Sequence, residues 1–272
     1  MGESSILKTP RGSVEFVRCG EGPAVLLLHG AMGGYDQGLL LGRAAIGSSG
    51  FEFIAVSRPG YLGTPLAMGR TPEEQADICA AVLDGLEIRD AGVVAVSGGG
   101  QCALQFALRF PDRCRALVMI SCCSAQLKTR VPLRFHVMRM MAAFPAVVGA
   151  MQKKVLKAPE RAFADPEAGA MLREMQLGVF ERIAERMPGT VNDIRQSRSP
   201  FDYPVERIAA PVLVVHGEAD EAAPFEDAER LARRVRAGEL LAIPGGTHVS
   251  LFTHRQVIQP RVTEFLSGLL RT

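Results

Sequence analysis

Short runs of almost entirely apolar residues alternate along the chain with segments that carry a helical apolar stripe. Such runs indicate strands buried on both faces, as in parallel sheets. We expect strands over residues 14–17, 24–28, 51–56, 93–96, 116–120, 212–215 and 240–243. We expect helices from Pro72, behind an N-cap at Thr71, and over residues 99–109, 225–236 and 256–270. This order predicts an α/β fold with a doubly wound, mostly parallel sheet.

One stretch breaks this alternation. From residue 124 to 204 the sequence shows helical patterns rich in Met, Arg and Ala, with breaks expected at Pro145, Pro159, Pro166 and Pro188-Gly189. We interpret residues 124–204 as a helical cap insertion over one end of the sheet, and residues 1–123 with 205–272 as the core. The segment 128–161 is strongly basic, which predicts either a solvated face or a surface for anionic substrates or membranes.

Composition limits the classes of function. The 272 residues are 47% hydrophobic and carry a net charge of only +2, without the basic excess usual for a nucleic-acid binder. No apolar stretch reaches the about 20 residues of a membrane span, and no signal core is evident, so we expect a cytoplasmic protein. The six cysteines have neither C-x-x-C nor zinc-ligand spacing, which predicts reduced thiols, no metal and no cofactor. The oligomeric state is left open.

The clearest chemical motif surrounds Ser97. A buried strand runs directly into Ser97, with the small residues Ala95 and Gly99 two positions to either side. A sharp strand-to-helix turn of this kind exposes the hydroxyl, and small neighbours let the backbone fold back on itself. The helix N-terminus that follows favours an oxyanion. A phosphate-binding loop fits less well, because no Lys follows the glycines.

Further polar residues follow other strands. His29-Gly30-Ala31-Met32 opens a small-residue loop that can aim backbone N–H groups at a negative charge. Asp220 lies just beyond one late strand, and His248 follows the last strand. Active sites of doubly wound sheets form at the carboxyl ends of strands. We therefore expect Ser97, Asp220 and His248 to meet there, in the chain order Ser, acid, His.

Together, the His29-Gly30 turn, the Ser97 turn, Gly217-x-x-Asp220 and the late His248 make the chain resemble the α/β-hydrolase family over nearly its whole length. The resemblance implies the α/β-hydrolase fold, with a cap between the sixth and seventh strands. Two positions depart from the family pattern. Ala95 stands where Gly is commonest, and Ser57 stands where many members have Asp, which we expect to alter loop packing only.

The resemblance also implies roles for these residues. Ser97 is the expected nucleophile, His248 the base and Asp220 the acid that orients the imidazole. Backbone N–H groups of Gly98 and Ala31 are expected to form the oxyanion hole, with Met32 as the alternative to Ala31.

Other residues are alternatives or structural candidates. Glu218 is an alternative acid in the same loop as Asp220. His216 and His254 are expected to be structural, and Asp36 is expected to cap a helix. The candidate substrate-pocket residues are His29, Met32 and His136.

A Ser nucleophile excludes the epoxide- and halide-displacing branches of this family, which use Asp. The expected function is a serine hydrolase that cleaves a carboxylic ester or lactone of a small acyl substrate through an acyl-enzyme intermediate. Thioester, amide or C–C bond hydrolysis are alternatives on the same fold, and a non-catalytic ligand-binding protein is an alternative of another class. The preferred substrate depends on the cap and is left open.

Overall fold

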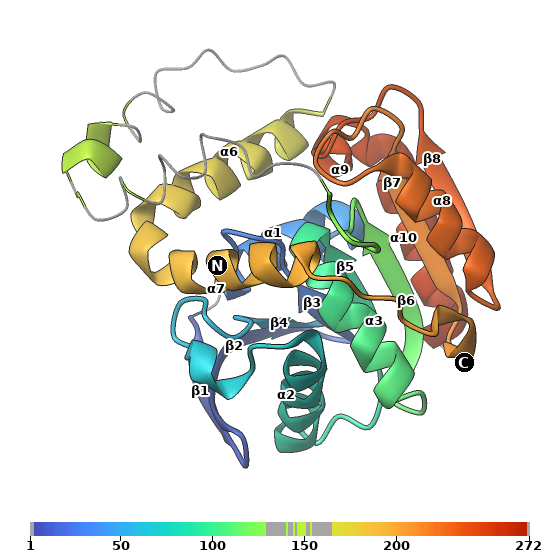
Figure 1. Cartoon of the computed structure of the whole chain (residues 1–272), viewed down its shortest axis with the longest axis horizontal. Coiled ribbons are helices and arrows are strands. Elements are labelled where there is room, and N and C mark those ends of the chain that lie inside the picture. The colour runs from blue at the N-terminus through green and yellow to red at the C-terminus, as the bar shows by residue number, and fades with distance from the viewer. Residues whose placement is uncertain are drawn as a thin grey trace.

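The computed structural model describes residues 3–128, 140, 144, 146–150, 153 and 165–270. Its centre is an eight-stranded sheet in the order β1-β2-β4-β3-β5-β6-β7-β8 (Figure 1). The strands are β1 Ser5–Thr9, β2 Gly12–Gly20, β3 Ala24–Leu28, β4 Glu52–Val56, β5 Ala91–Val96, β6 Cys114–Ile120, β7 Val212–Gly217 and β8 Gly238–Ile243. β2 pairs antiparallel with both β1 and β4, and all the other pairings are parallel. The predicted doubly wound, mostly parallel sheet is confirmed.

Helices cover both faces of the sheet. One face carries α1 Tyr35–Ile46 and α10 Arg255–Leu270, which pack against each other. The other face carries α2 Pro72–Gly85, α3 Gly100–Arg109 and α8 Phe225–Arg234. Short helical turns complete the core: Leu66–Met68 (η1), Ser97–Gly99 (η2), Val205–Arg207 (η3) and α9 Ser250–Thr253. The predicted cap of α2 is present, since Thr71 Oγ1 accepts from Glu74 N–H and the Glu74 carboxylate accepts from Thr71 N–H.

β1 was not predicted from the sequence, and α1 was anticipated only as a helix start at Asp36. β1 is an edge strand with mostly exposed side chains, so it carries no continuous apolar run. α1 contains Gly38 and Gly42 and is buried on nearly all sides. A Cβ on Gly42 would collide with the methyl groups of Leu27 in β3. The glycines thus lower helix propensity and at the same time allow close packing on the sheet.

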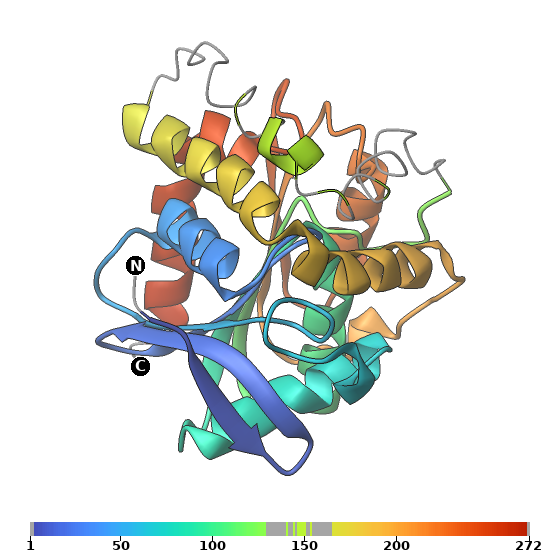
Figure 2. The ribbon, with the colours of Figure 1, turned by 90° about the vertical axis from the view of Figure 1, so that its left-hand side faces the viewer.

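The cap helices α6 Pro166–Glu181 and α7 Ile183–Arg198 lie between β6 and β7 in the sequence. Figures 1 and 2 show them across one end of the sheet, with α6 beside α1. Helical structure in this part of the chain agrees with the predicted cap. The boundaries at residues 124 and 204 stay a prediction. So does the role of the basic segment 128–161, most of which lies outside the described residues.

The expected helix break at Pro188-Gly189 is wrong, because α7 continues through it. Pro188 cannot donate a backbone hydrogen bond, which ordinarily disrupts a helix interior. Here Gly189 N–H donates to the Gly60 carbonyl oxygen at 2.8 Å, and Leu62 N–H donates to the Glu185 carbonyl oxygen at 3.0 Å. Gly189 N–H and Glu185 C=O are the groups that would pair in an uninterrupted helix. The proline thus coincides with a docking seam between α7 and the core loop 60–62.

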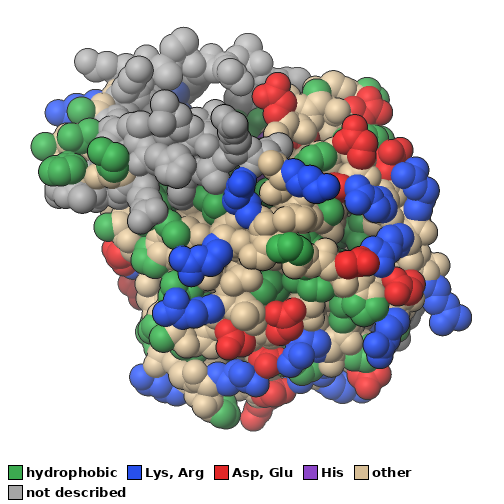
Figure 3. Space-filling view, in the orientation of Figure 1, with side chains coloured by type: hydrophobic (Ala, Val, Ile, Leu, Met, Phe, Trp, Pro, Cys, Tyr) green, Lys and Arg blue, Asp and Glu red, His purple; other side chains and the backbone are tan. Residues whose placement is uncertain are grey.

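Basic and acidic side chains are interspersed over the face shown in Figure 3. Within the described ranges, no helix is long and apolar enough to cross a membrane. The six cysteines are free thiols, and all but Cys19 are buried.

Candidate active site

Ser97 lies where β5 ends and turns into α3. Its φ of 53° falls in the left-handed region, which residues other than Gly rarely adopt. The turn is closely packed on both sides. A Cβ on Gly99 would lie 2.6 Å from the Leu28 carbonyl oxygen, and a Cβ on Gly30 would lie 2.9 Å from Ser97 Cβ. The small residues around Ser97 are therefore required by the neighbouring backbone.

Three polar side chains from separate loops meet at this turn. His248 Nε2 lies 2.9 Å from Ser97 Oγ, and His248 Nδ1 lies 2.9 Å from Asp220 Oδ2. Asp220 follows β7, and His248 follows β8. The parallel strands thus bring the three residues together at the carboxyl ends of the strands, where they form a continuous chain of hydrogen bonds. In this arrangement a neutral imidazole donates from Nδ1 to the carboxylate and accepts the serine proton at Nε2.

The Asp220 carboxylate is buried and fully engaged. Its Oδ1 accepts from the N–H groups of Ala222 at 2.9 Å and Ala223 at 3.0 Å. His216 Nε2 lies 3.3 Å from Oδ2 and also donates to the Ala223 carbonyl oxygen at 2.9 Å. Burial opposes ionisation, but the hydrogen bonds from His216 and His248 outweigh it and hold the pKa of Asp220 well below its usual range. The alternative acid, Glu218, is exposed.

The candidate oxyanion hole lies between the Ser97 turn and the loop after β3. The Ala31 nitrogen is 3.3 Å from the place a Cβ would take on Gly98, so the two backbones are adjacent. The Met32 N–H already donates to Thr190 Oγ1 of α7 at 2.9 Å. This geometry favours Ala31 over Met32 as the partner of Gly98.

The candidate pocket residues fall in different places. His29 is fully buried, with Nδ1 2.7 Å from the Gly30 carbonyl oxygen and Nε2 accepting from Arg58 N–H at 3.1 Å. Burial, and then the charge of Arg58, hold the pKa of His29 well below its usual value, so the ring is neutral. His29 is thus enclosed by its neighbours, and its place in a substrate pocket stays a prediction. Met32 is also largely buried, in a cluster that includes Ile183 and Met187. His136 lies outside the described residues.

Ser57, which departs from the family pattern, has an acidic partner on a neighbouring strand. Its hydroxyl donates to Glu15 Oε2 at 2.9 Å and accepts from Tyr35 N–H at 3.1 Å. Glu15 is buried in β2 and also accepts from Gly63 N–H at 2.8 Å. A carboxylate is therefore present at this loop, although it comes from a different strand.

Asp36 is not a helix cap. The residue before α1 is Gly34, and Asp36 lies in the first turn, where it pairs with Arg186 of α7 at 2.5 Å. A basic partner from a distant helix has no local sequence signal, which is why this contact was missed. Among the described residues, no group of three His, Cys, Asp or Glu side chains could hold a metal ion.

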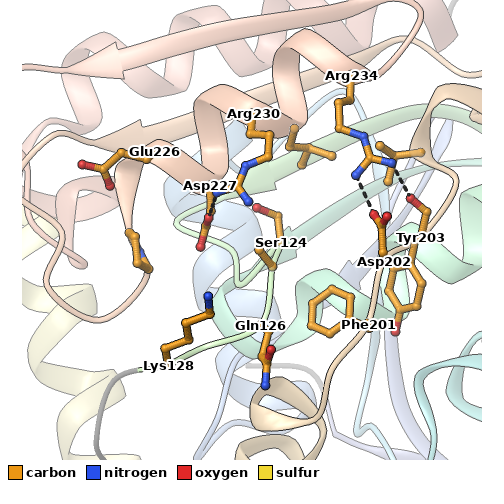
Figure 4. Close-up of a pocket in the computed structure, with 14 residues that line it drawn as sticks. Ser124, Gln126, Lys128, Phe201, Asp202, Tyr203, Glu226, Asp227, Arg230 and Arg234 are labelled. Atoms are coloured by element: carbon orange, nitrogen blue, oxygen red, sulfur yellow. Dashed lines mark hydrogen bonds and ion pairs between the residues drawn. The ribbon is translucent and has the colours of Figure 1, made fainter.

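A hollow lies apart from these residues, where the chain leaves the core after β6 and returns before β7 (Figure 4). It encloses about 600 Å³ between residues 124–128, residues 201–205 and one side of α8 along its length, from Pro224 to Arg234. Arg230 pairs with Asp227, and Arg234 pairs with Asp202, so both arginines have partners within the wall. None of Ser97, Asp220 and His248 lines it, and we assign it no ligand.

Comparisons with known proteins agree with this architecture. The sequence model described as the alpha/beta hydrolase family matches residues 25–259. The solved structure of an alpha/beta hydrolase fold protein from Nakamurella multipartita is 32% identical, with a TM-score of 0.79, and the match covers 97% of this chain and 99% of that one.

Two curated relatives carry enzyme names. A poly(3-hydroxyalkanoate) depolymerase from Ectopseudomonas oleovorans is 28% identical over 79% of this chain and 75% of its own. A bifunctional esterase/perhydrolase from Acinetobacter calcoaceticus is 26% identical over 80% of this chain and 82% of its own. The chain therefore belongs to the α/β-hydrolase family, as the sequence motifs predict, and is a hydrolase with esterase-like relatives.

Proposed function

We propose that the protein is a serine hydrolase that cleaves a carboxylic ester or lactone of a small acyl substrate. The observation that carries the proposal is the hydrogen-bonded chain from Ser97 Oγ through His248 to Asp220. The esterase name of one relative supports the choice of an ester bond.

The first half of the reaction forms an acyl-enzyme. Ser97 Oγ attacks the substrate carbonyl carbon while its proton passes to His248 Nε2. Asp220, held ionised by its hydrogen bonds, stabilises the imidazolium that results. Negative charge develops on the carbonyl oxygen, where the N–H groups of Gly98 and Ala31 would receive it. The tetrahedral species then collapses, the C–O bond to the alcohol breaks, and His248 returns the proton to the leaving oxygen.

The second half releases the acid. Water loses a proton to His248 Nε2 and attacks the acyl carbon, and the second tetrahedral species expels Ser97 Oγ, which regains the proton. The enzyme ends as it began. No cofactor takes part in this proposed sequence.

The test is turnover of p-nitrophenyl butyrate by the wild type and by Ser97→Ala and His248→Ala. We expect both variants to lose activity by about three orders of magnitude or more while remaining folded, because the triad acts as a unit. His254→Gln is the control, since this imidazole lies outside the triad. A fluorophosphonate should label Ser97 in the wild type only. Near-wild-type turnover by Ser97→Ala would overturn the mechanism, and a wild type without turnover or labelling would favour a ligand-binding role.

A further inference from the structure

We propose that α7 of the cap is part of the catalytic apparatus. Arg186, Thr190 and Asp193 are positioning residues that hold the backbone of the oxyanion hole. The proposal rests on the proposed function, because it assigns these residues a role in ester turnover. Their spacing of four and then three residues places them on one face of α7. All three are buried, although polar residues in a cap helix are more often exposed.

Thr190 holds the oxyanion loop by its backbone. Its hydroxyl accepts from Met32 N–H at 2.9 Å and donates to the Arg186 carbonyl oxygen at 2.9 Å, so both its donor and its acceptor are satisfied. Met32 is the residue directly after Ala31. Its N–H therefore fixes the plane of the peptide that joins it to Ala31.

Arg186 holds the same loop one residue further on. Its guanidinium donates to the Gly33 carbonyl oxygen at 2.8 Å and pairs with Asp36 at 2.5 Å. The Arg186 side chain is 1% exposed, so water competes little for these bonds. Thr190 and Arg186 thus bind the loop on both sides of Met32.

Asp193 acts from the opposite side of the hole. Its Oδ2 lies 3.1 Å from the position that a Cβ would take on Gly98. The carboxylate is held away from solvent by Arg58 at 2.5 Å and by the Tyr61 hydroxyl at 2.6 Å. Arg58 also donates from Nε to the His29 carbonyl oxygen at 3.0 Å. One ion pair therefore links α7, the Ser97 turn and the start of the oxyanion loop.

The backbone of the loop explains why such support is needed. Met32 has a φ of 61°, in the left-handed region that residues other than Gly rarely adopt. A loop held in this conformation persists only when its surroundings fix it. The contacts just described come from α7, so the shape of the loop that carries the Ala31 N–H depends on a helix outside the core sheet.

The experiment compares Thr190→Val with Thr190→Ser. Valine keeps the shape of threonine but removes the acceptor for Met32 N–H, whereas serine keeps the hydroxyl. We expect Thr190→Val to lower kcat on p-nitrophenyl butyrate by about 10-fold with little change in KM. The affinity for a trifluoromethyl ketone, which forms a tetrahedral adduct with Ser97, should fall by a similar factor. Thr190→Ser should keep kcat close to the wild-type value.

The matched control is Thr263→Val, which removes a hydroxyl bonded to the Ile46 carbonyl oxygen, far from the site. It should leave kcat and the ketone affinity at wild-type values. Should Thr190→Val fail to fold, Thr190→Ala removes the same hydroxyl without placing a second methyl against the loop.

Unchanged kcat in a folded Thr190→Val or Thr190→Ala, or a loss that Thr190→Ser does not rescue, overturns the positioning role and leaves the triad proposal standing. A change in KM alone would make Thr190 a substrate-binding residue and would equally overturn it. A wild type that neither hydrolyses the ester nor is labelled at Ser97 removes both proposals together.

Discussion

The lowered pKa of the His29 imidazole makes the free energy of unfolding depend on pH. Burial and the neighbouring Arg58 hold its pKa well below 6.5, so the folded protein keeps the ring neutral. In the unfolded chain the ring titrates near 6.5. Below that pH the unfolded state binds a proton that the folded state does not, and stability is lost as the pH falls.

We therefore expect the free energy of unfolding to decline on going from about pH 7.5 to about pH 5.5, and to decline less in His29→Gln. Urea denaturation at a series of pH values measures both slopes. Thr263→Val serves as the reference for a substitution that removes no titrating group. Parallel slopes for the wild type and His29→Gln would show that another group carries the dependence.

Single residues also show how far the sequence could predict the site. Ser97, Asp220 and His248 follow strand ends, and parallel strands end at one edge, so their meeting could be expected from the pattern alone. The residues that support the site from α7 could not be predicted in this way. Thr190 and Asp193 belong to a helix about 90 residues beyond Ser97 in the chain. The only available signal was a polar stripe at 186, 190 and 193, which also fits an exposed helix face.

At the scale of elements, the sequence predicted the strands buried on both faces better than the others. β5 and β7 are buried along their whole length, so their apolar runs stand out. The edge strand β1 was missed because its side chains are mostly exposed, and α1 was anticipated only as a helix start at Asp36 because its glycines lower helix propensity. Pro188 led to the opposite error, because a helix end was predicted where α7 continues. The helical hydrogen bond that is lost there is replaced by bonds to loop 60–62, which is more than 120 residues away in the chain and so leaves no local sequence signal.

The docking seam between α7 and loop 60–62 has no room for a side chain at Gly189. A Cβ there would overlap the Tyr61 ring, and the Cα of Gly189 is 2.7 Å from a Cβ built on Gly60. We expect Gly189→Ala to destabilise the protein by roughly 1–3 kcal/mol in urea denaturation, as overpacking does. Gly178→Ala in α6 is the control. Its Cβ would meet nothing closer than 3.9 Å, so the higher helix propensity of Ala should leave stability equal or greater. Equal effects of the two substitutions would contradict the seam.

At the scale of the whole molecule, the buried pair of Arg58 and Asp193 joins the core to α7. Their side chains are 1% and 6% exposed. Removing one member of such a pair strands the other charge away from water. The pair therefore ties the stability of α7 to that of the sheet, and we expect the two to unfold together.

Asp193→Leu should lower the free energy of unfolding by about 3–5 kcal/mol, because the Arg58 guanidinium is left without its carboxylate. Adding Arg58→Met should recover part of that loss, since the double variant buries no lone charge. Urea denaturation followed by circular dichroism measures both. A double variant less stable than Asp193→Leu would show that the other bonds of Arg58 outweigh its pairing with Asp193.

The seam at Gly189 also bears on recombination between relatives. A chimera that exchanged the whole stretch between β6 and β7 would keep this seam only if the donor helix carried a proline and glycine in register with loop 60–62. A donor helix without them would lack the free backbone groups that pair with that loop in this chain. A crossover placed just before Asp165 retains α6 and α7 with the host sheet. Residues 166–198 would then stay with the host core, and the exchanged segment would be shorter than the whole stretch between β6 and β7.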